Sequence, residues 1–161
     1  MANFDHIKAL AFDHQGTLFD KHAVGGLIDE TFPGQGEAIP RAWFETTKQY
    51  CWLSGLMERH LTWAELTHRA LTYSVRAAGC EMDDDLHARL MEADLHLPPF
   101  ADVPDALARL AARFDLYVLS MASPSTIAES QRHAGVDRFF KKVVSPETAK
   151  VYKPAPGAYH Y

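Results

Sequence analysis

The sequence is poor in the features that mark secreted, membrane-spanning or nucleic-acid-binding proteins. Its 161 residues include only two cysteines, Cys51 and Cys80, whose spacing favours reduced packing residues over a disulfide or a metal site. No apolar run approaches the roughly 18 to 20 residues that cross a bilayer, and the first residues lack the charged and apolar blocks of a signal peptide. With 16 basic against 21 acidic residues, the chain has no basic cluster that could follow a phosphate backbone. We therefore expect a cytoplasmic protein that binds neither nucleic acid nor membranes.

The chain does have the apolar content of a folded domain, at 47% of its residues. A continuous apolar run that ends in a glycine turn predicts a buried strand at residues 7–12. Residues 20–97 show a helical pattern. One helix is predicted to begin at Pro40, a second to begin with the capping box of Thr62 and Glu65, and a third to follow the aspartate run DDD.

The remaining residues alternate between helix and strand. We predict a helix at residues 104–113, a strand at 116–119, a helix at 124–134 and a third strand at 143–144. Strands that alternate with helices indicate a parallel sheet. The helical stretch between the first two strands is too long for an ordinary crossover, so it is better explained as an inserted cap.

The predicted fold is therefore α/β, with a Rossmann-like core of residues 1–19 and 98–161 around a parallel sheet, and a helical cap of residues 20–97. Three strands leave a sheet edge unpaired, which makes a homodimer a candidate assembly.

Polar residues follow each predicted strand. Asp13 follows the first, Ser120 the second, and Lys153 lies in the loop after the third. Ligands of open parallel sheets sit beyond the carboxyl ends of the strands, so all three are predicted to face one crevice. A carboxylate there can act as a nucleophile, with hydroxyls from Thr17 and Ser120 and a cation from Lys153 beside it. Each residue alone also has an ordinary structural explanation as a cap, a turn or a solvated charge.

Four segments carry a family resemblance: FDHQGTLFD, LYVLSMASPSTI, HAGVDRFF and VYKPAPGAY. They resemble the haloacid dehalogenase superfamily, and specifically its L-2-haloacid dehalogenases. The resemblance implies a cofactor-free hydrolase in which Asp13 attacks the carbon that bears the leaving group. The resulting ester would then be hydrolysed by water.

The resemblance also implies roles for further residues. Thr17 would orient the nucleophile, Ser120 would hold the substrate carboxylate, and Lys153 would keep the carboxylates charged. Trp63 matches an aromatic of the substrate pocket, although a tryptophan on an amphipathic helix is more often core. Tyr159 matches the tyrosine of a KPxxxxY pattern, with helix packing as the alternative.

Three positions depart from the family. Gln15 replaces a tyrosine and excludes the second aspartate of the superfamily's phosphatases, which disfavours magnesium-dependent phosphoryl transfer, so we expect no metal. Phe44 stands where an arginine should receive the departing halide, and Met121 where an asparagine follows the serine. A phenyl ring cannot hydrogen-bond a halide as a guanidinium can. Arg41 could substitute, but it lies about one helical turn away.

These departures leave three functions open for a small 2-substituted carboxylic acid as substrate or ligand. The first is hydrolysis through an aspartyl ester with an amine leaving group, such as the ring opening of azetidine-2-carboxylate, in which Glu45 could meet a cationic nitrogen. Glu45 could equally be a solvated helix carboxylate. The alternatives are (S)-2-haloacid dehalogenation and an inactive fold that only binds. His14 and His22 are candidate proton carriers near the nucleophile, although isolated histidines are usually surface residues.

The chain stops at Tyr161, before the strand and the acidic SSNxWD-type loop that the resemblance leads us to expect. It is therefore expected either to be a fragment of a longer protein or to obtain those strands from elsewhere.

Overall fold

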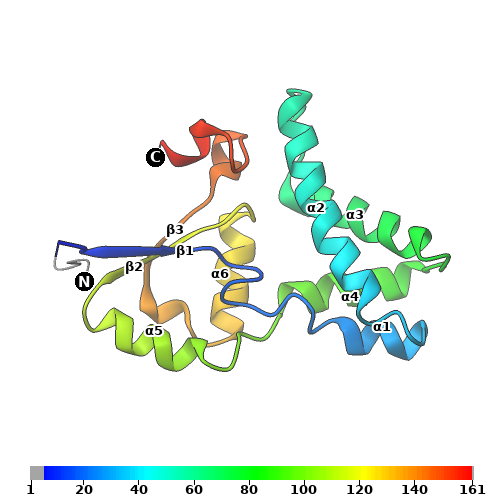
Figure 1. The fold of residues 1–161 in the computed structure, drawn as a ribbon, viewed down its shortest axis with the longest axis horizontal. Helices are drawn as coiled ribbons and strands as arrows, with labels where there is room; N and C mark the ends of the chain where they lie inside the picture. The colour runs from blue at the N-terminus through cyan, green and yellow to red at the C-terminus, as the bar shows by residue number, and fades with distance from the viewer. Residues whose placement is uncertain (1–5, 161) are drawn as a thin grey trace, which may run out of the picture.

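A parallel sheet forms the core in the computed structural model, which describes residues 6–160. The strand order is β1 (Ala9–Phe12), β2 (Asp115–Leu119) and β3 (Phe140–Val144), with β2 in the centre. Figure 1 shows the sheet on one side of the molecule and the cap helices on the other. The predicted α/β class and the parallel sheet with an inserted helical segment are confirmed.

The first strand is an edge strand, and the prediction that it is buried is wrong. Ala9 and Ala11 are exposed, while Leu10 and Phe12 are half-buried against the core. Helix α5 (Val103–Ala111) lies below the strands in Figure 1, and α6 (Pro124–His133) runs downward beside their right-hand ends. The alternating burial of β1 shows that one of its faces is covered and the other is open in the described part of the chain. The apolar run Ala9–Phe12 has alanine at every second position, and apolar character alone does not distinguish a strand covered on both faces from one covered on a single face.

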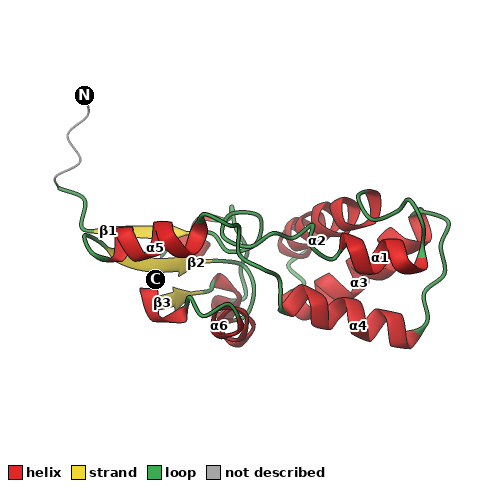
Figure 2. Cartoon of the chain, turned by 90° about the horizontal axis from the view of Figure 1, so that it is seen from below, coloured by secondary structure: helices red, strands yellow, loops and turns green. Residues whose placement is uncertain are grey.

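The cap consists of helices α1 (Gly25–Thr31), α2 (Ala38–Leu56), α3 (Trp63–Ala77) and α4 (Asp84–Leu95). Figure 2 shows these helices as a body beside the sheet. The Trp43 indole N–H donates to the Thr67 carbonyl oxygen at 2.9 Å, which joins α2 to α3. Helix α1 lies within the stretch predicted as helical, but it was not predicted as a separate helix.

Local signals mark the helix ends, and the predicted capping box of α3 is confirmed. The Thr62 hydroxyl accepts a hydrogen bond from the Glu65 backbone, and the Glu65 carboxylate accepts one from the Thr62 backbone. Ser123 caps α6 through the Thr126 N–H at 3.1 Å. Beyond the two helix ends, Gly79 and Gly135 have positive φ angles, the conformation that ends a helix at low steric cost.

Two chain segments link the sheet to the cap side by side. The Asp20 N–H donates to the Pro98 carbonyl oxygen at 2.9 Å, and the Phe100 N–H donates to the Leu18 carbonyl oxygen at 3.0 Å. Phe19 lies between these bonds and is fully buried. The links lie where the sequence predicts a boundary between core and cap, although the division into two domains stays a prediction.

Both cysteines are free thiols, as predicted. Burial raises the pKa of the Cys51 thiol to about 12, so this side chain is neutral at physiological pH. Within residues 6–160, no helix combines the length and the apolar content needed to cross a membrane.

Candidate active site

The site begins with a pair of charges at the carboxyl ends of the strands. Asp13 follows β1, and its Oδ1 lies 3.2 Å from the Lys153 Nζ. The same ammonium donates to the Leu119 carbonyl oxygen at 3.1 Å, at the end of β2. The His14 backbone N–H donates to Asp13 Oδ1 at 2.9 Å. Asp13 and Lys153 are therefore in contact, while the crevice that they and Ser120 are expected to share stays a prediction.

The two side chains of this pair differ in exposure. Asp13 is 47% exposed, whereas Lys153 is only 18% exposed. A carboxylate that is open to solvent on one side and held by an ammonium on the other can approach a small molecule.

Three other predicted residues lie on the same edge of the sheet. Ser120 is buried directly after β2, and its backbone N–H donates to the Val144 carbonyl oxygen at 3.2 Å. Met121 packs half-buried against the core. Thr17 is exposed in the turn after β1, and among residues 6–160 no hydrogen bond joins its hydroxyl to Asp13. Their roles toward a substrate stay predictions.

A narrow cavity of about 10 Å³ lies between the β1 loop and the cap. Gln15, Phe44 and Trp63, three residues predicted to bind substrate, line this pocket. Its full lining is Gln15, Lys21, Pro40, Trp43, Phe44, Thr47, Trp63, Thr67 and Asp94. The walls are therefore mainly aromatic, with two charged residues, Lys21 and Asp94, that the sequence analysis did not identify.

Lys21 lies on the face of the Phe44 ring. Its Nζ is 3.1 Å from the ring centroid, which is a cation–π contact. Burial lowers the pKa of Lys21, and the Lys48 ammonium lowers it further. No local sequence signal marks Lys21, because its partner is 23 positions away on another element.

Asp94 meets Gln15 across the pocket. The Gln15 Nε2 lies 3.4 Å from both Asp94 carboxylate oxygens, and the Asp94 residue is half-buried. Burial raises the pKa of Asp94 to about 6, while the hydrogen bond from Gln15 acts in the opposite direction. In the structure, Gln15 thus holds a cap carboxylate.

His14 is placed in the core, although isolated histidines were expected at the surface. Its ring stacks on Phe19 with centroids 4.2 Å apart, and within residues 6–160 its Nε2 has no hydrogen-bond partner. Burial lowers the pKa of His14 to about 4, although the nearby Asp13 carboxylate opposes this. The imidazole is neutral at pH 7 and does not line the pocket, whereas His22 is exposed.

Three further candidates also lie outside the pocket lining. Glu45 is exposed and pairs with Lys48 at 2.9 Å, and the hydrogen bond from Lys48 lowers the Glu45 pKa. Arg41 is exposed on α2. Tyr159 is 55% exposed on a short 3₁₀ turn, Pro156–Tyr159.

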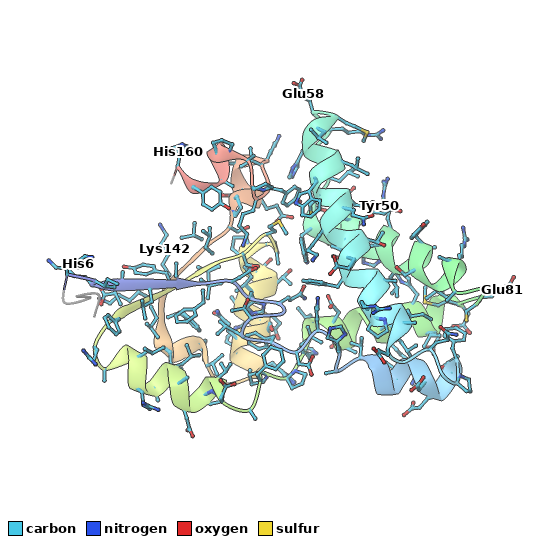
Figure 3. The ribbon with its side chains drawn as sticks, in the orientation of Figure 1. His6, Tyr50, Glu58, Glu81, Lys142 and His160 are labelled. Atoms are coloured by element: carbon cyan, nitrogen blue, oxygen red, sulfur yellow. The ribbon has the colours of Figure 1, made fainter. Side chains whose placement is uncertain are left out.

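The segment before Lys153 also fixes the cap. The Tyr152 hydroxyl donates to the Leu61 carbonyl oxygen at 2.6 Å, and Glu147 accepts a hydrogen bond from the Trp63 backbone. A larger, mainly apolar groove lies between the last turns of α2 and residues 150–155. In Figure 3, Glu58 marks the α2 side of this groove. Among residues 6–160, no group of three or more His, Cys, Asp or Glu side chains is arranged to hold a metal ion.

Comparison with known proteins assigns the chain. A family model described as a haloacid dehalogenase-like hydrolase matches residues 7–161. The chain belongs to this family of hydrolases. An (S)-2-haloacid dehalogenase of Pseudomonas sp. (strain YL) is 40% identical over 151 residues, which cover 93% of this chain and 65% of the relative. A haloacetate dehalogenase H-2 of Moraxella sp. (strain B) is 37% identical over 95% of this chain and 69% of that protein.

Solved structures show the same likeness for this haloacid dehalogenase-like hydrolase. The L-2-haloacid dehalogenase of Xanthobacter autotrophicus with chloropropionic acid covalently bound superposes with a TM-score of 0.87 at 33% identity. The match covers 95% of this chain and 62% of that one. The chain thus spans about two thirds of the length of these relatives. The family resemblance seen in the sequence is confirmed.

Proposed function

We propose that the protein is an (S)-2-haloacid dehalogenase that works through an ester on Asp13. The observation that carries this proposal is the exposed Asp13 carboxylate, held by Lys153 at 3.2 Å at the carboxyl ends of the strands. The relatives named above are dehalogenases, and one solved structure holds chloropropionic acid covalently bound. The names of the relatives support dehalogenation, and the covalently bound acid supports a covalent intermediate in this chain.

The reaction would proceed in two steps. An Asp13 carboxylate oxygen attacks C2 of the 2-haloacid, the carbon–halogen bond breaks, and the halide leaves with the bonding electrons. Water then attacks the ester carbonyl, which releases the 2-hydroxy acid and a proton and restores the carboxylate. Lys153 would keep Asp13 ionised, Ser120 would hold the substrate carboxylate, and Thr17 would orient the nucleophile.

Dehalogenation replaces ring opening as the favoured reaction. The ring-opening hypothesis depended on Phe44 in place of a halide-binding arginine and on Glu45 facing a cationic nitrogen. Glu45 instead pairs with Lys48 outside the pocket, and the relatives named above act on halogenated acids. A carbon–nitrogen bond as the target therefore has no support from these proteins.

The test is halide release by the protein expressed from its full reading frame. Chloride release from (S)-2-chloropropionate is expected, with little from the (R) enantiomer and none from the Asp13→Asn variant. Asp105→Asn, which changes an exposed carboxylate on α5, is the matched control and should retain activity. Ring opening of azetidine-2-carboxylate without chloride release would overturn the proposal.

A further inference from the structure

Lys21 brings an unpaired positive charge to the pocket wall. Within residues 6–160, no carboxylate oxygen lies within 4.0 Å of its ammonium, and the ammonium lies on the face of the Phe44 ring. Lys48 also approaches this ring, at 4.7 Å from the centroid, but its ammonium pairs with Glu45 at 2.9 Å. The same ring thus carries one cation in a close ion pair and one, Lys21, on which the Glu45 and Asp20 carboxylates act only from beyond 4.0 Å.

The Lys21–Phe44 stack lies against the loop of the nucleophile. A Cβ built on Gly16, three residues after Asp13, would lie 3.6 Å from the Phe44 Cζ and 3.7 Å from the Lys21 Cδ. Gly16 has a φ of +77°, which a side chain would strain. The turn after β1 therefore brings the backbone next to the stack, and Gln15, the preceding residue, lines the same pocket.

A partly buried ammonium with free N–H donors is an anion-binding group. Lysine has three such donors, and the ring face cannot accept all of them. Burial lowers the Lys21 pKa, so an incoming anion would restore the stabilisation that water no longer supplies. Trp43, Phe44 and Trp63 provide a weakly polar wall, which suits a large and poorly hydrated anion such as a halide.

We propose that the Lys21 ammonium is the halide acceptor of this enzyme, and that Phe44 positions it through the cation–π contact. The inference rests on the proposed function. As Asp13 forms its bond to C2, the halide would depart with the electron pair and be met by an N–H of Lys21. The Phe44 ring then needs no hydrogen-bond donor of its own, because it positions the Lys21 ammonium, which supplies the donor.

The test compares Lys21→Met with Lys21→Arg, and uses Lys48→Met as the matched control on the same ring. Three quantities are measured in the full-length protein: kcat for chloride release, kcat for bromide release, and the inhibition constant of added bromide. Lys21→Met is expected to lower kcat by about 100- to 1,000-fold, as for loss of one preorganised donor, and to do so more for chloride than for bromide. Bromide inhibition should be lost in Lys21→Met and kept in Lys21→Arg and Lys48→Met.

The two proposals fail in different ways. Lys21→Met with wild-type kcat and an unchanged bromide inhibition constant would overturn the role of Lys21 while dehalogenation stands. If the wild type releases no halide, the proposed function fails, and bromide binding is then read directly from quenching of tryptophan fluorescence. Quenching that saturates in the wild type and not in Lys21→Met supports the anion site. Equal quenching in both proteins overturns it.

Discussion

The Lys153 ammonium lies 3.2 Å from Asp13 Oδ1 and, at the same time, donates to the Leu119 carbonyl oxygen at 3.1 Å. One side chain thereby ties the end of β1 to the end of β2. Because Lys153 is largely buried, its charge acts on Asp13 with less screening than a surface pair would have. The Lys153 ammonium can therefore fix the direction of the Asp13 carboxylate.

Replacing this cation should impair chemistry far more than folding. Lys153→Met removes the charge beside the nucleophile and is expected to lower kcat by about 100- to 1,000-fold, the typical cost of losing one preorganised electrostatic contact. Lys142→Met, at an exposed lysine of β3 that Figure 3 labels, is the matched control and should be unchanged within about twofold. Steady-state halide release and far-UV circular dichroism of both variants check this. Similar losses in the two variants would contradict the role of Lys153.

The ester on Asp13 predicts where oxygen from water first appears. In a single turnover in heavy-oxygen water, the water attacks the ester carbonyl, so the label should enter the Asp13 carboxylate and the product should carry unlabelled oxygen. Mass spectrometry of the peptide that contains Asp13 measures the label. Direct attack of water on the substrate would instead place the label in the product during the first turnover and leave Asp13 unlabelled.

Divalent metal should be dispensable. A carboxylate that attacks carbon needs no cation to neutralise phosphate oxygens, and the position of the second aspartate of the superfamily's phosphatases is held by Gln15, which contacts Asp94. Halide release should therefore survive treatment with a chelator. Loss of activity that magnesium restores would return phosphoryl transfer to consideration.

Interactions within a few residues of the chain could be predicted from the sequence, whereas most contacts between separate elements could not. The Thr62–Glu65 capping box and the Ser123 cap span only three residues, so the sequence contains the whole interaction. Asp13 and Lys153 were predicted to meet from one topological rule, that parallel strands end at the same edge. Contacts that depend on the packing of separate elements, such as Lys21 with Phe44, cannot be predicted from a local motif or from the order of the strands.

Helix α1 and His14 show the same limit. Helix α1 has glycines at positions 25 and 26 and no side-chain cap, so its propensity is low. It is held instead by packing, since a side chain at Gly25 would overlap the Gly36 carbonyl oxygen. Because His14 follows a strand, the sequence predicts a loop residue there. In the structure its carbonyl oxygen accepts three backbone hydrogen bonds, from Thr17, Leu18 and Phe19. That tight turn directs the imidazole into the core.

Burial of neutral His14 should make stability depend on pH. The unfolded chain binds this proton with a pKa near 6.5 and the folded chain with a pKa of about 4, so stability is lost as pH falls from about 6.5 to about 4. At 1.36 kcal/mol per pKa unit, the loss is on the order of 3 kcal/mol. His14→Phe keeps an aromatic ring against Phe19 and removes the titration.

Urea unfolding of the wild type and His14→Phe at several pH values measures this loss. The difference in unfolding free energy between the two proteins should shift in favour of the variant as pH falls through this window. His22→Phe, at an exposed histidine, is the control and should follow the wild type. A pH-independent difference for His14→Phe would contradict the assignment.

Asp94 should act on stability with the opposite sign. Its folded pKa is about 6, above the unfolded value of 3.8, so the folded chain holds the proton more tightly and stability falls as pH rises from about 3.8 to about 6. Above that window the charged carboxylate carries a constant penalty. Asp94→Asn removes the charge and keeps an oxygen that can accept the Gln15 hydrogen bond. The free energy of unfolding of the variant is expected to exceed that of the wild type by about 1 to 3 kcal/mol at pH 7.5 and to equal it near pH 4.

The matched control is Asp85→Asn, an exposed carboxylate on the same helix. Asp85 lies in the first turn of α4, where a negative charge favours the helix dipole, so its removal should lower stability slightly at pH 7.5. If Asp94→Asn raises the free energy of unfolding at pH 7.5 and Asp85→Asn lowers it, the gain comes from the burial of Asp94 in the pocket. It does not come from the total charge of α4. Loss of stability in Asp94→Asn at pH 7.5 would mean that the ionised carboxylate is stabilised by its surroundings. The pocket would then hold compensating positive charge near Asp94, and the Lys21 ammonium would not be free to receive a halide.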